Sequence, residues 1–150
     1  NVDSSFYLCQ SFLPFLKRGR NASVINISSV AGITSTGTGA VYAMTKAAMV
    51  QLTKNLACEW GKFSIRVNCV APWMTMTPML AKAVQNDPGA LEKVKSATPL
   101  SVGYGRLPDP KESATTVCFL CMPAASFISG QTIAVDGGFH ANGFMGPCVE

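Results

Sequence analysis

Three short runs rich in β-branched residues alternate with segments whose apolar residues recur at the spacing of a helix. This alternation is what most constrains the fold. The runs are "SVINIS" (residues 23–28), "IRVNCVA" (65–71) and "QTIAVDGG" (131–138), and turn residues bound each of them, as expected for buried strands. Between them, apolar residues at steps of three and four predict a helix over 41–60, and a proline in the first turn favours another over 110–122. Connections of this length predict an α/β fold with a parallel sheet.

The remaining segments predict further helices around this sheet. Residues 1–17 have apolar side chains at helical spacing, and Pro14 comes late enough to bend or end that helix. Residues 78–103 are expected to form short helices around "NDPG". Because no repeat or linker interrupts the chain, we predict one domain, or part of one, over residues 1–150.

Composition and charge exclude several functions. Hydrophobic residues make up 48% of the chain and charged residues 13%, which favours a packed interior. The net charge of +4 is scattered, and the single basic cluster at residues 17–20 has no interleaved aromatic residues, so a nucleic-acid partner is not expected. No uninterrupted apolar run reaches 18 residues, which argues against a membrane span.

The chain has six cysteines, which could in principle form disulfides, but most of them lie in segments that are predicted to be helix or strand interior. We expect reduced, buried thiols, which suit a cytoplasmic protein. Cys118 and Cys121 form a CxxC pair, but zinc needs two further ligands, and His140, the single histidine, has no partner at ligand spacing. No metal site is therefore predicted.

Tyr42 and Lys46 in "AVYAMTKAAM" lie one helical turn apart and share a face of the predicted helix. An ammonium ~5 Å from the phenol, at an effective dielectric of ~20, favours the phenolate by about 3 kcal/mol. Tyr42 would then be a usable proton donor and acceptor near neutral pH. The alternative is a spacing that arose by chance, with a solvated lysine.

Ser29 stands at the carboxyl end of the "SVINIS" strand, thirteen residues before Tyr42. The carboxyl ends of strands are where α/β sheets gather their ligands, so this hydroxyl could hold a carbonyl oxygen beside the tyrosine. The alternative is a strand-end serine that only bonds the local turn. Ser28 is an adjacent competitor for the same role.

Four motifs in this order and spacing, "INISSVAG", "YAMTK", "IRVNCVAP" and "GQTIAVDGG", resemble the second half of a short-chain dehydrogenase/reductase. The segments "VAPWMTMTPM" and "VDGGFHANGF" resemble the plant tropinone reductase homologues in particular. The resemblance implies a partial Rossmann-type doubly wound parallel sheet. It also implies that residues 1–150 are the carboxyl-terminal catalytic portion of one domain, without the amino-terminal dinucleotide-binding portion.

Site roles follow from the same resemblance. It implies that Tyr42 donates the proton when a ketone is reduced, that Ser29 orients the carbonyl, and that Lys46 binds the nicotinamide ribose and supports the tyrosine. Asn1 matches the asparagine of the family's proton relay.

The loop after the second strand, "PWMTMT", resembles the family's cofactor loop, so Pro72, Trp73, Thr75 and Thr77 are expected to contact the nicotinamide end. Trp73 and Thr75 depart from the usual residues there, and Trp73 could instead be a core aromatic. Residues 78–105 resemble the variable substrate lid. With Met76 and Leu80, Met74 and Met79 would make its inner surface apolar and contact substrate, although the same methionines could be core filler.

The predicted function is NADPH-dependent reduction of a small carbonyl substrate, with NAD not excluded. No glycine-rich turn follows a strand and opens a helix, so the adenosine-binding half is expected to be missing and nucleotide binding to be weak. The resemblance also implies a homo-oligomer that uses the helices at 1–17 and 41–60. The alternative function is that of a truncated interaction module that dimerises with intact relatives.

Overall fold

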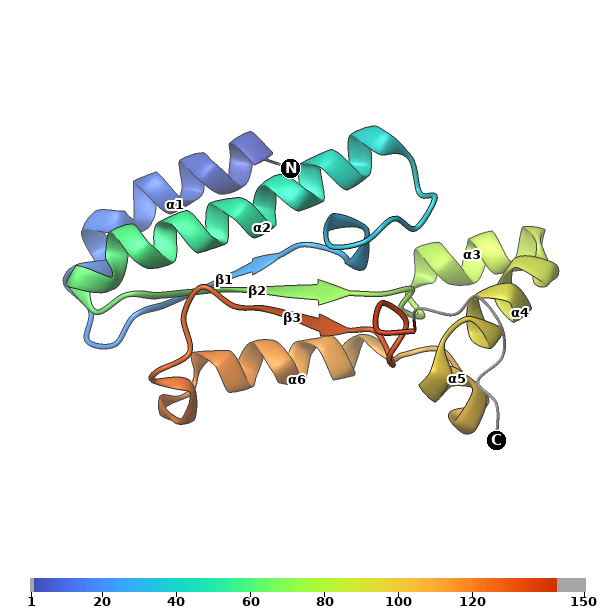
Figure 1. The fold of residues 1–150 in the computed structure, drawn as a ribbon. Coiled ribbons are helices and arrows are strands. Elements are labelled where there is room, and N and C mark those ends of the chain that lie inside the picture. Colours follow the sequence, from blue (N-terminus) through green and yellow to red (C-terminus); the bar gives the residue numbers. More distant parts are fainter. Residues whose placement is uncertain (1, 143–150) are drawn as a thin grey trace.

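Three parallel strands in the order β1–β2–β3 form the centre of the molecule in a computed structural model, which describes residues 2–142 (Figure 1). They are β1 (Ser23–Ile27), β2 (Arg66–Pro72) and β3 (Thr132–Val135). Ser23 lies opposite Arg66, and Cys69 lies opposite Thr132. The α/β prediction is confirmed, and β1 is an edge strand of this sheet.

Helices cover both faces of the sheet, as in a doubly wound fold (Figure 1). The two long ones, α1 (Val2–Leu16) and α2 (Ala40–Trp60), lie on one face, and α6 (Pro110–Cys121) lies on the other. Three short helices, α3 (Pro78–Asn86), α4 (Pro88–Ser96) and α5 (Pro99–Tyr104), gather beyond the carboxyl ends of the strands. Among residues 2–142, no helix combines the length and the continuous apolar character that a bilayer crossing needs.

Local sequence explains where several elements begin and end. Pro14 lies in the last turn of α1, and the helix ends shortly after it at Leu16, as predicted for a proline that bends or ends the segment. Asp109 and Glu112 cap the start of α6 in a reciprocal capping box, with Pro110 at the first helical position. The third strand ends at Val135, and the "DGG" that follows forms the predicted turn.

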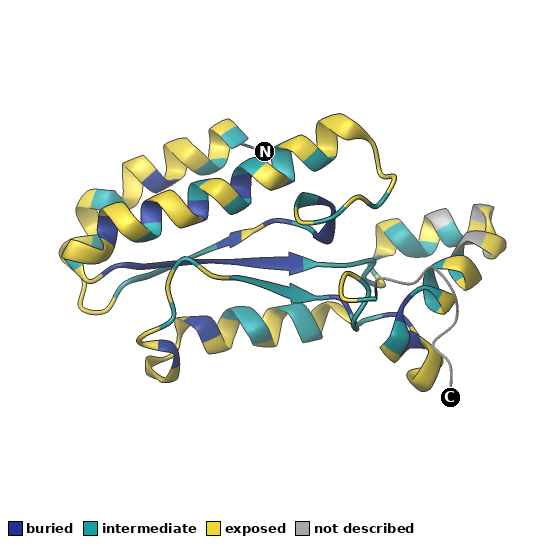
Figure 2. Ribbon diagram, viewed as in Figure 1, coloured by how far each residue is buried: buried dark blue, intermediate teal, exposed yellow. Residues whose placement is uncertain are grey.

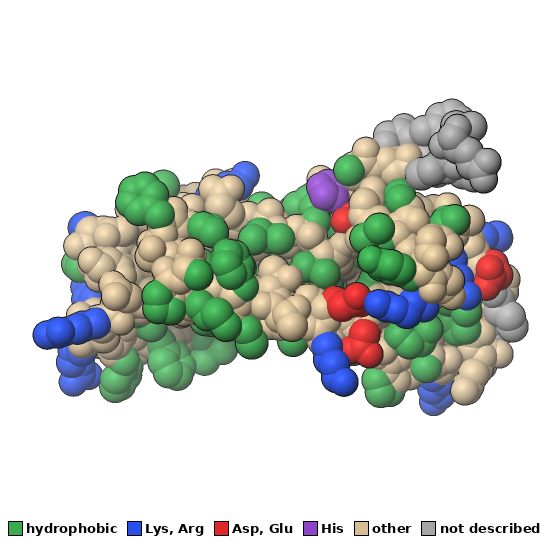
Figure 3. Space-filling model, turned by 90° about the horizontal axis from the view of Figure 1, so that it is seen from below, with side chains coloured by type: hydrophobic (Ala, Val, Ile, Leu, Met, Phe, Trp, Pro, Cys, Tyr) green, Lys and Arg blue, Asp and Glu red, His purple; other side chains and the backbone are tan. Residues whose placement is uncertain are grey.

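Two clusters of apolar side chains form the core, one on each side of the sheet. Strand β2 is the most continuously buried part of the chain (Figure 2). Leu56, Trp60 and Val67 belong to the cluster beneath α1 and α2, and Val70 and Leu120 belong to the cluster under α6. Viewed from the α6 side, hydrophobic side chains are spread over the surface, and acidic ones gather where α5 and the start of α6 lie (Figure 3).

The cysteines differ from expectation. Cys9 and Cys69 are buried, and burial raises the pKa of both thiols. Cys58, Cys118 and Cys121 are exposed, so the prediction of buried thiols is wrong for these three; all five are free. Periodicity assigned them to helices but not to a face of those helices, and the face was decided by packing. Cys148 lies outside the described residues.

Candidate active site

A cavity of about 500 Å³ opens at the carboxyl end of the sheet. Its walls come from the end of β1, the first turns of α2, the loop after β2, and the beginnings of α3 and α6. With the exception of Asn1, which lies outside the described residues, every residue predicted for catalysis, cofactor or substrate lines it: Ser29, Tyr42, Lys46, Pro72, Trp73, Met74, Thr75, Thr77 and Met79. The segments 29–46 and 72–79, which the rest of α2 and most of β2 separate in the chain, therefore meet at one place.

Tyr42 and Lys46 project from the first half of α2 toward this cavity. The Lys46 Nζ donates to the carbonyl oxygen of Ile27 at 3.1 Å, which ties the lysine to the end of β1. The same Nζ lies 5.7 Å from the centre of the Tyr42 ring. Lys46 is the single charged side chain among the described residues that line the cavity, so an anionic oxygen formed there would have this ammonium as its neighbour.

The two serines at the end of β1 have different roles. The Ser28 hydroxyl is buried and donates to the Lys46 carbonyl at 2.7 Å, so it holds β1 against α2. The Ser29 hydroxyl accepts from the Ala31 amide at 3.2 Å and caps a short 3-10 turn over Val30–Gly32. Since accepting leaves its own hydrogen free, Ser29 can bond the turn and still donate to a ligand.

Gly32 lets this turn approach α2. A side-chain carbon at position 32 would lie 2.6 Å from the Lys46 carbonyl carbon and 2.8 Å from the Ser28 hydroxyl oxygen. Such distances are shorter than real contacts, so only glycine fits. The close approach sets the Ser29 turn against the part of α2 that carries Lys46.

The loop after β2 turns into the cavity wall through local hydrogen bonds. The Thr75 hydroxyl donates to the Trp73 carbonyl at 2.9 Å. The Thr77 hydroxyl accepts from the Leu80 amide at 3.3 Å and keeps its hydrogen available for a ligand. Trp73 is half-buried and lines the cavity, so it is not a purely core aromatic.

The structure places the methionines of this segment in two different cavities. Met74, Met79 and Leu80 line the cavity, and Met79 is 82% exposed. Met76 does not: its amide donates to Pro108, and its side chain lines a different cavity beside Leu91 and Leu107. The reason is the turn that the hydrogen bonds of Thr75 and Thr77 impose on the loop.

Sequence reasoning missed three hydroxyls on the wall. Thr36 and Thr38 share a hydrogen bond of 2.8 Å on the loop before α2. Ser113, in the first turns of α6, has a buried hydroxyl without a hydrogen-bond partner in the part of the chain that the structure describes. No sequence pattern marked them, because only the tertiary fold brings them to the cavity. Across residues 2–142, no three His, Cys, Asp or Glu side chains gather as a metal site would require.

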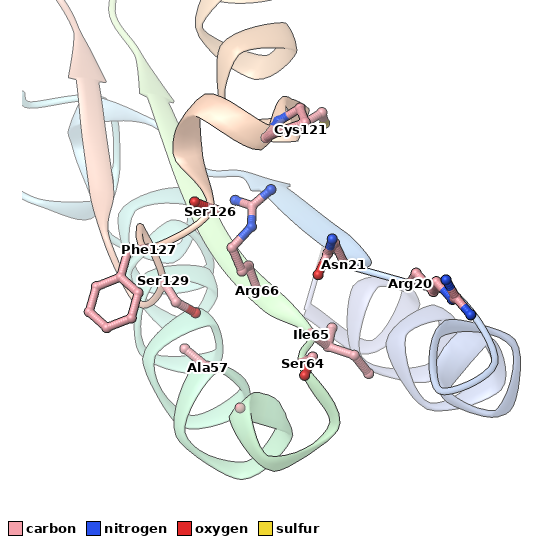
Figure 4. A pocket seen from close by; sticks show the side chains of 12 residues that line it. Arg20, Asn21, Ala57, Ser64, Ile65, Arg66, Cys121, Ser126, Phe127 and Ser129 are labelled. Atoms are coloured by element: carbon pink, nitrogen blue, oxygen red, sulfur yellow. The ribbon is translucent and has the colours of Figure 1, made fainter.

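A larger cavity, of about 710 Å³, lies at the amino ends of the strands (Figure 4). Arg66 lines it, and one of its Nη atoms donates to the carbonyl oxygen of Leu120 at 2.7 Å. This bond caps the carboxyl end of α6, where helix carbonyls favour a cation. The described residues of this cavity include no tyrosine, histidine, lysine or carboxylate, so the Tyr42–Lys46 pair has no counterpart there.

A family model described as enoyl-(acyl carrier protein) reductase matches residues 1–140. Two similar solved structures are a short-chain type dehydrogenase/reductase from Mycobacterium ulcerans and a 3-oxoacyl-[acyl-carrier protein] reductase with bound NAD from Brucella melitensis. The first is 30% identical with a TM-score of 0.86, and the match covers 99% of this chain and 51% of the Mycobacterium ulcerans chain. The second is 37% identical with a TM-score of 0.77, covering 93% and 49%. The chain belongs to the short-chain dehydrogenase/reductase family.

Within that family it is similar to tropinone reductase homologues of Arabidopsis thaliana. Two of them are 47% and 46% identical over 144 residues, which is 96% of this chain and 53% of each relative. A third, named chloroplastic, is 47% identical over 145 residues, covering 97% of this chain and 44% of the relative. The chain spans about half the length of these curated relatives.

Proposed function

We propose that this chain carries the catalytic residues of an NADPH-dependent reductase that acts on a small ketone, as the carboxyl-terminal catalytic portion of a dehydrogenase/reductase domain. The observation that carries the proposal is the meeting of Ser29, Tyr42 and Lys46 on one cavity. The methionines and Leu80 on the same wall favour a small, apolar carbonyl compound.

Three side chains divide the work on the carbonyl. The Ser29 hydroxyl donates to the carbonyl oxygen and holds it beside Tyr42. As the carbon–oxygen π pair moves onto oxygen, that oxygen takes the phenolic proton of Tyr42, and Lys46 stabilises the phenolate left behind. The nicotinamide, when bound, supplies the hydride to the carbonyl carbon. Asn1 is proposed to join the relay that returns a proton to Tyr42.

The residues present fit the nicotinamide end of such a cofactor. Lys46 supplies the donors for a ribose, and its bond to Ile27 leaves two of its three hydrogens available. Thr77 has a free hydroxyl hydrogen on the same wall, and Pro72, Trp73 and Thr75 complete the loop that would face the ring. We propose NADPH as the donor. NADH is the alternative, in keeping with the NAD bound to the Brucella melitensis relative.

The Tyr42→Phe variant tests the proposal. Because Tyr42 is 41% exposed, removing its hydroxyl should leave the unfolding temperature unchanged but lower the NADPH-dependent reduction of ketones about a hundredfold or more. Tyr7→Phe is the matched control, since Tyr7 is 63% exposed on α1 and outside the cavity. Undiminished reduction by Tyr42→Phe would show that the assignment is wrong.

A second candidate function is that of an interaction module. The open edge of β1 and the exposed aromatic residues of α1 favour it, because both are surfaces that another chain could cover. We also propose a homo-oligomer through α1 and α2. Capture by an intact relative, without NADPH consumption by this chain, would favour the module over the enzyme.

The proposed compartment is the cytoplasm, where free thiols such as Cys58, Cys118 and Cys121 stay reduced. The name of the third relative places that protein in the chloroplast, which is the alternative.

A further inference from the structure

The turn that follows β3 is fixed by one buried carboxylate. Asp136 is 5% exposed, and its two oxygens accept from the Gly138 amide at 3.1 Å and from the His140 amide at 2.9 Å. The His140 ring nitrogen Nδ1 contacts the second oxygen at 2.5 Å. These bonds close the turn on both sides of Phe139 and hold its backbone in place.

Phe139 points at the wall of the candidate active site. Its ring stacks on the indole of Trp73, with the ring centres 3.8 Å apart and the planes 14° from parallel. The same turn is bonded to the start of α5, where the Leu100 amide donates to the Gly137 carbonyl at 3.0 Å. The stack is therefore supported by β3 on one side and by α5 on the other.

Trp73 is held from two further directions. Its amide donates to the Val135 carbonyl at 3.1 Å, and its indole Nε1 donates to the Thr98 hydroxyl at 3.0 Å. Thr98 is fully buried and itself donates to the Val94 carbonyl at 2.7 Å, so its oxygen is a fixed acceptor. The indole edge and the indole face thus have one partner each, Thr98 and Phe139.

We propose that Phe139, held by the Asp136–His140 turn, is a positioning residue that fixes the Trp73 indole as a rigid wall of the Tyr42 cavity and so limits the bulk of the ketone that the cavity admits. The inference rests on the proposed function. Trp73 and Tyr42 line the same cavity, whereas Phe139 lines none of its surface and acts through the indole. A rigid wall rejects a bulky ketone, and a wall free to tilt accepts it.

Phe139→Leu keeps an apolar side chain but removes the stacked ring. With cyclohexanone as the small ketone and 4-tert-butylcyclohexanone as the bulky one, we expect kcat for cyclohexanone to stay within about twofold. The preference for the small ketone, as a ratio of kcat/KM values, should fall about fivefold, mainly through a lower KM for the bulky one. Phe139→Tyr, which keeps the ring, should restore the preference. Phe127→Leu is the matched control, because Phe127 is fully exposed and far from the cavity.

A second readout needs no substrate. The chain has two tryptophans, and Trp60 is 5% exposed, so acrylamide quenches mainly Trp73. Phe139→Leu should raise the quenching constant about twofold, and Phe127→Leu should leave it unchanged. Unchanged quenching in Phe139→Leu, or an equal loss of kcat/KM for both ketones, would overturn the positioning role. If the unsubstituted chain fails to oxidise saturating NADPH with any ketone, the interaction module is favoured over the enzyme. The role of Phe139 is then decided by two measurements that need no turnover. They are the quenching constants and a titration with the bulky ketone, monitored through the fluorescence of Trp73.

Discussion

Gly32 carries no functional group, yet the candidate site depends on it, because only a residue without a side chain lets the Ser29 turn approach Lys46 so closely. We expect Gly32→Ala to push the Ser29 turn away from Lys46, because the new carbon would meet backbone atoms at 2.6 and 2.7 Å that cannot rotate away. Overpacking of this kind costs about 1–3 kcal/mol of unfolding free energy. The urea midpoint should fall. The kcat/KM for ketone reduction should also fall, by more than the loss of folded protein alone would explain. Gly61→Ala is the control, since nothing lies within 4 Å of the added carbon. Equal stability of the two variants would contradict the close-approach explanation.

Helix α6 places Ser113 on the cavity wall, and the position of its first turn depends on its charged cap. The Glu112 carboxylate accepts two hydrogen bonds from Arg106, at 3.0 and 2.9 Å, and one from the Asp109 amide at 2.7 Å. The Arg106 guanidinium, followed by the Asp109 amide, lowers the pKa of Glu112 from 4.5 to about 2. Because the folded-state pKa is the lower one, the stabilisation is complete above pH 4.5 and is lost as the pH falls toward 2.

Glu112→Gln should therefore flatten the acid side of the stability profile. The wild-type urea midpoint is expected to fall as the pH drops from about 4.5 toward 2, and the midpoint of the variant, which has no carboxylate to protonate, should fall less. Protonation of Asp136 should lower the urea midpoint in the same pH direction. Burial alone would raise the pKa of this carboxyl, but the hydrogen bonds from His140 and Gly138 outweigh burial and hold the pKa below 3.8. Glu92→Gln is the control, because that carboxylate is 72% exposed and lies in the middle of α4, not at the start of a helix. If the urea midpoints of wild type and Glu112→Gln fall in parallel with pH, the α6 cap is not the source of the acid destabilisation.

Across residues 2–142, large apolar side chains are exposed and β1 pairs with a strand on one side only. On α1, five large apolar side chains are exposed: Phe6, Tyr7, Leu8, Phe12 and Phe15. A groove of about 440 Å³ runs between this helix and the edge strand β1. Exposed surfaces of this kind favour association with another chain, either a second copy or an intact relative.

Phe15→Glu should weaken that association. Phe15 is 62% exposed on α1, so a carboxylate there is solvated in the monomer and becomes costly when a partner covers it. We expect sedimentation to show self-association of the unsubstituted chain, and about a tenfold weaker association of the variant. A tagged Arabidopsis relative should likewise capture the unsubstituted chain better. Val102→Glu, on α5 and 61% exposed, serves as the control. If both variants lose the same amount of association, the interface lies elsewhere or the added charge acts in a general way.

Local patterns in the sequence determined the strands, the helices and the carboxyl ends at which Ser29 and the loop from Pro72 to Thr77 lie, since these depend on residues near one another in the chain. The spacing of Tyr42 and Lys46 on one helix face was readable for the same reason. Only the tertiary structure decided which cysteines are exposed, that Met76 leaves the cavity, and that Phe139 stacks on Trp73. Each of these depends on contacts between segments far apart in the chain, and a side chain's periodicity does not say which distant neighbour it will meet.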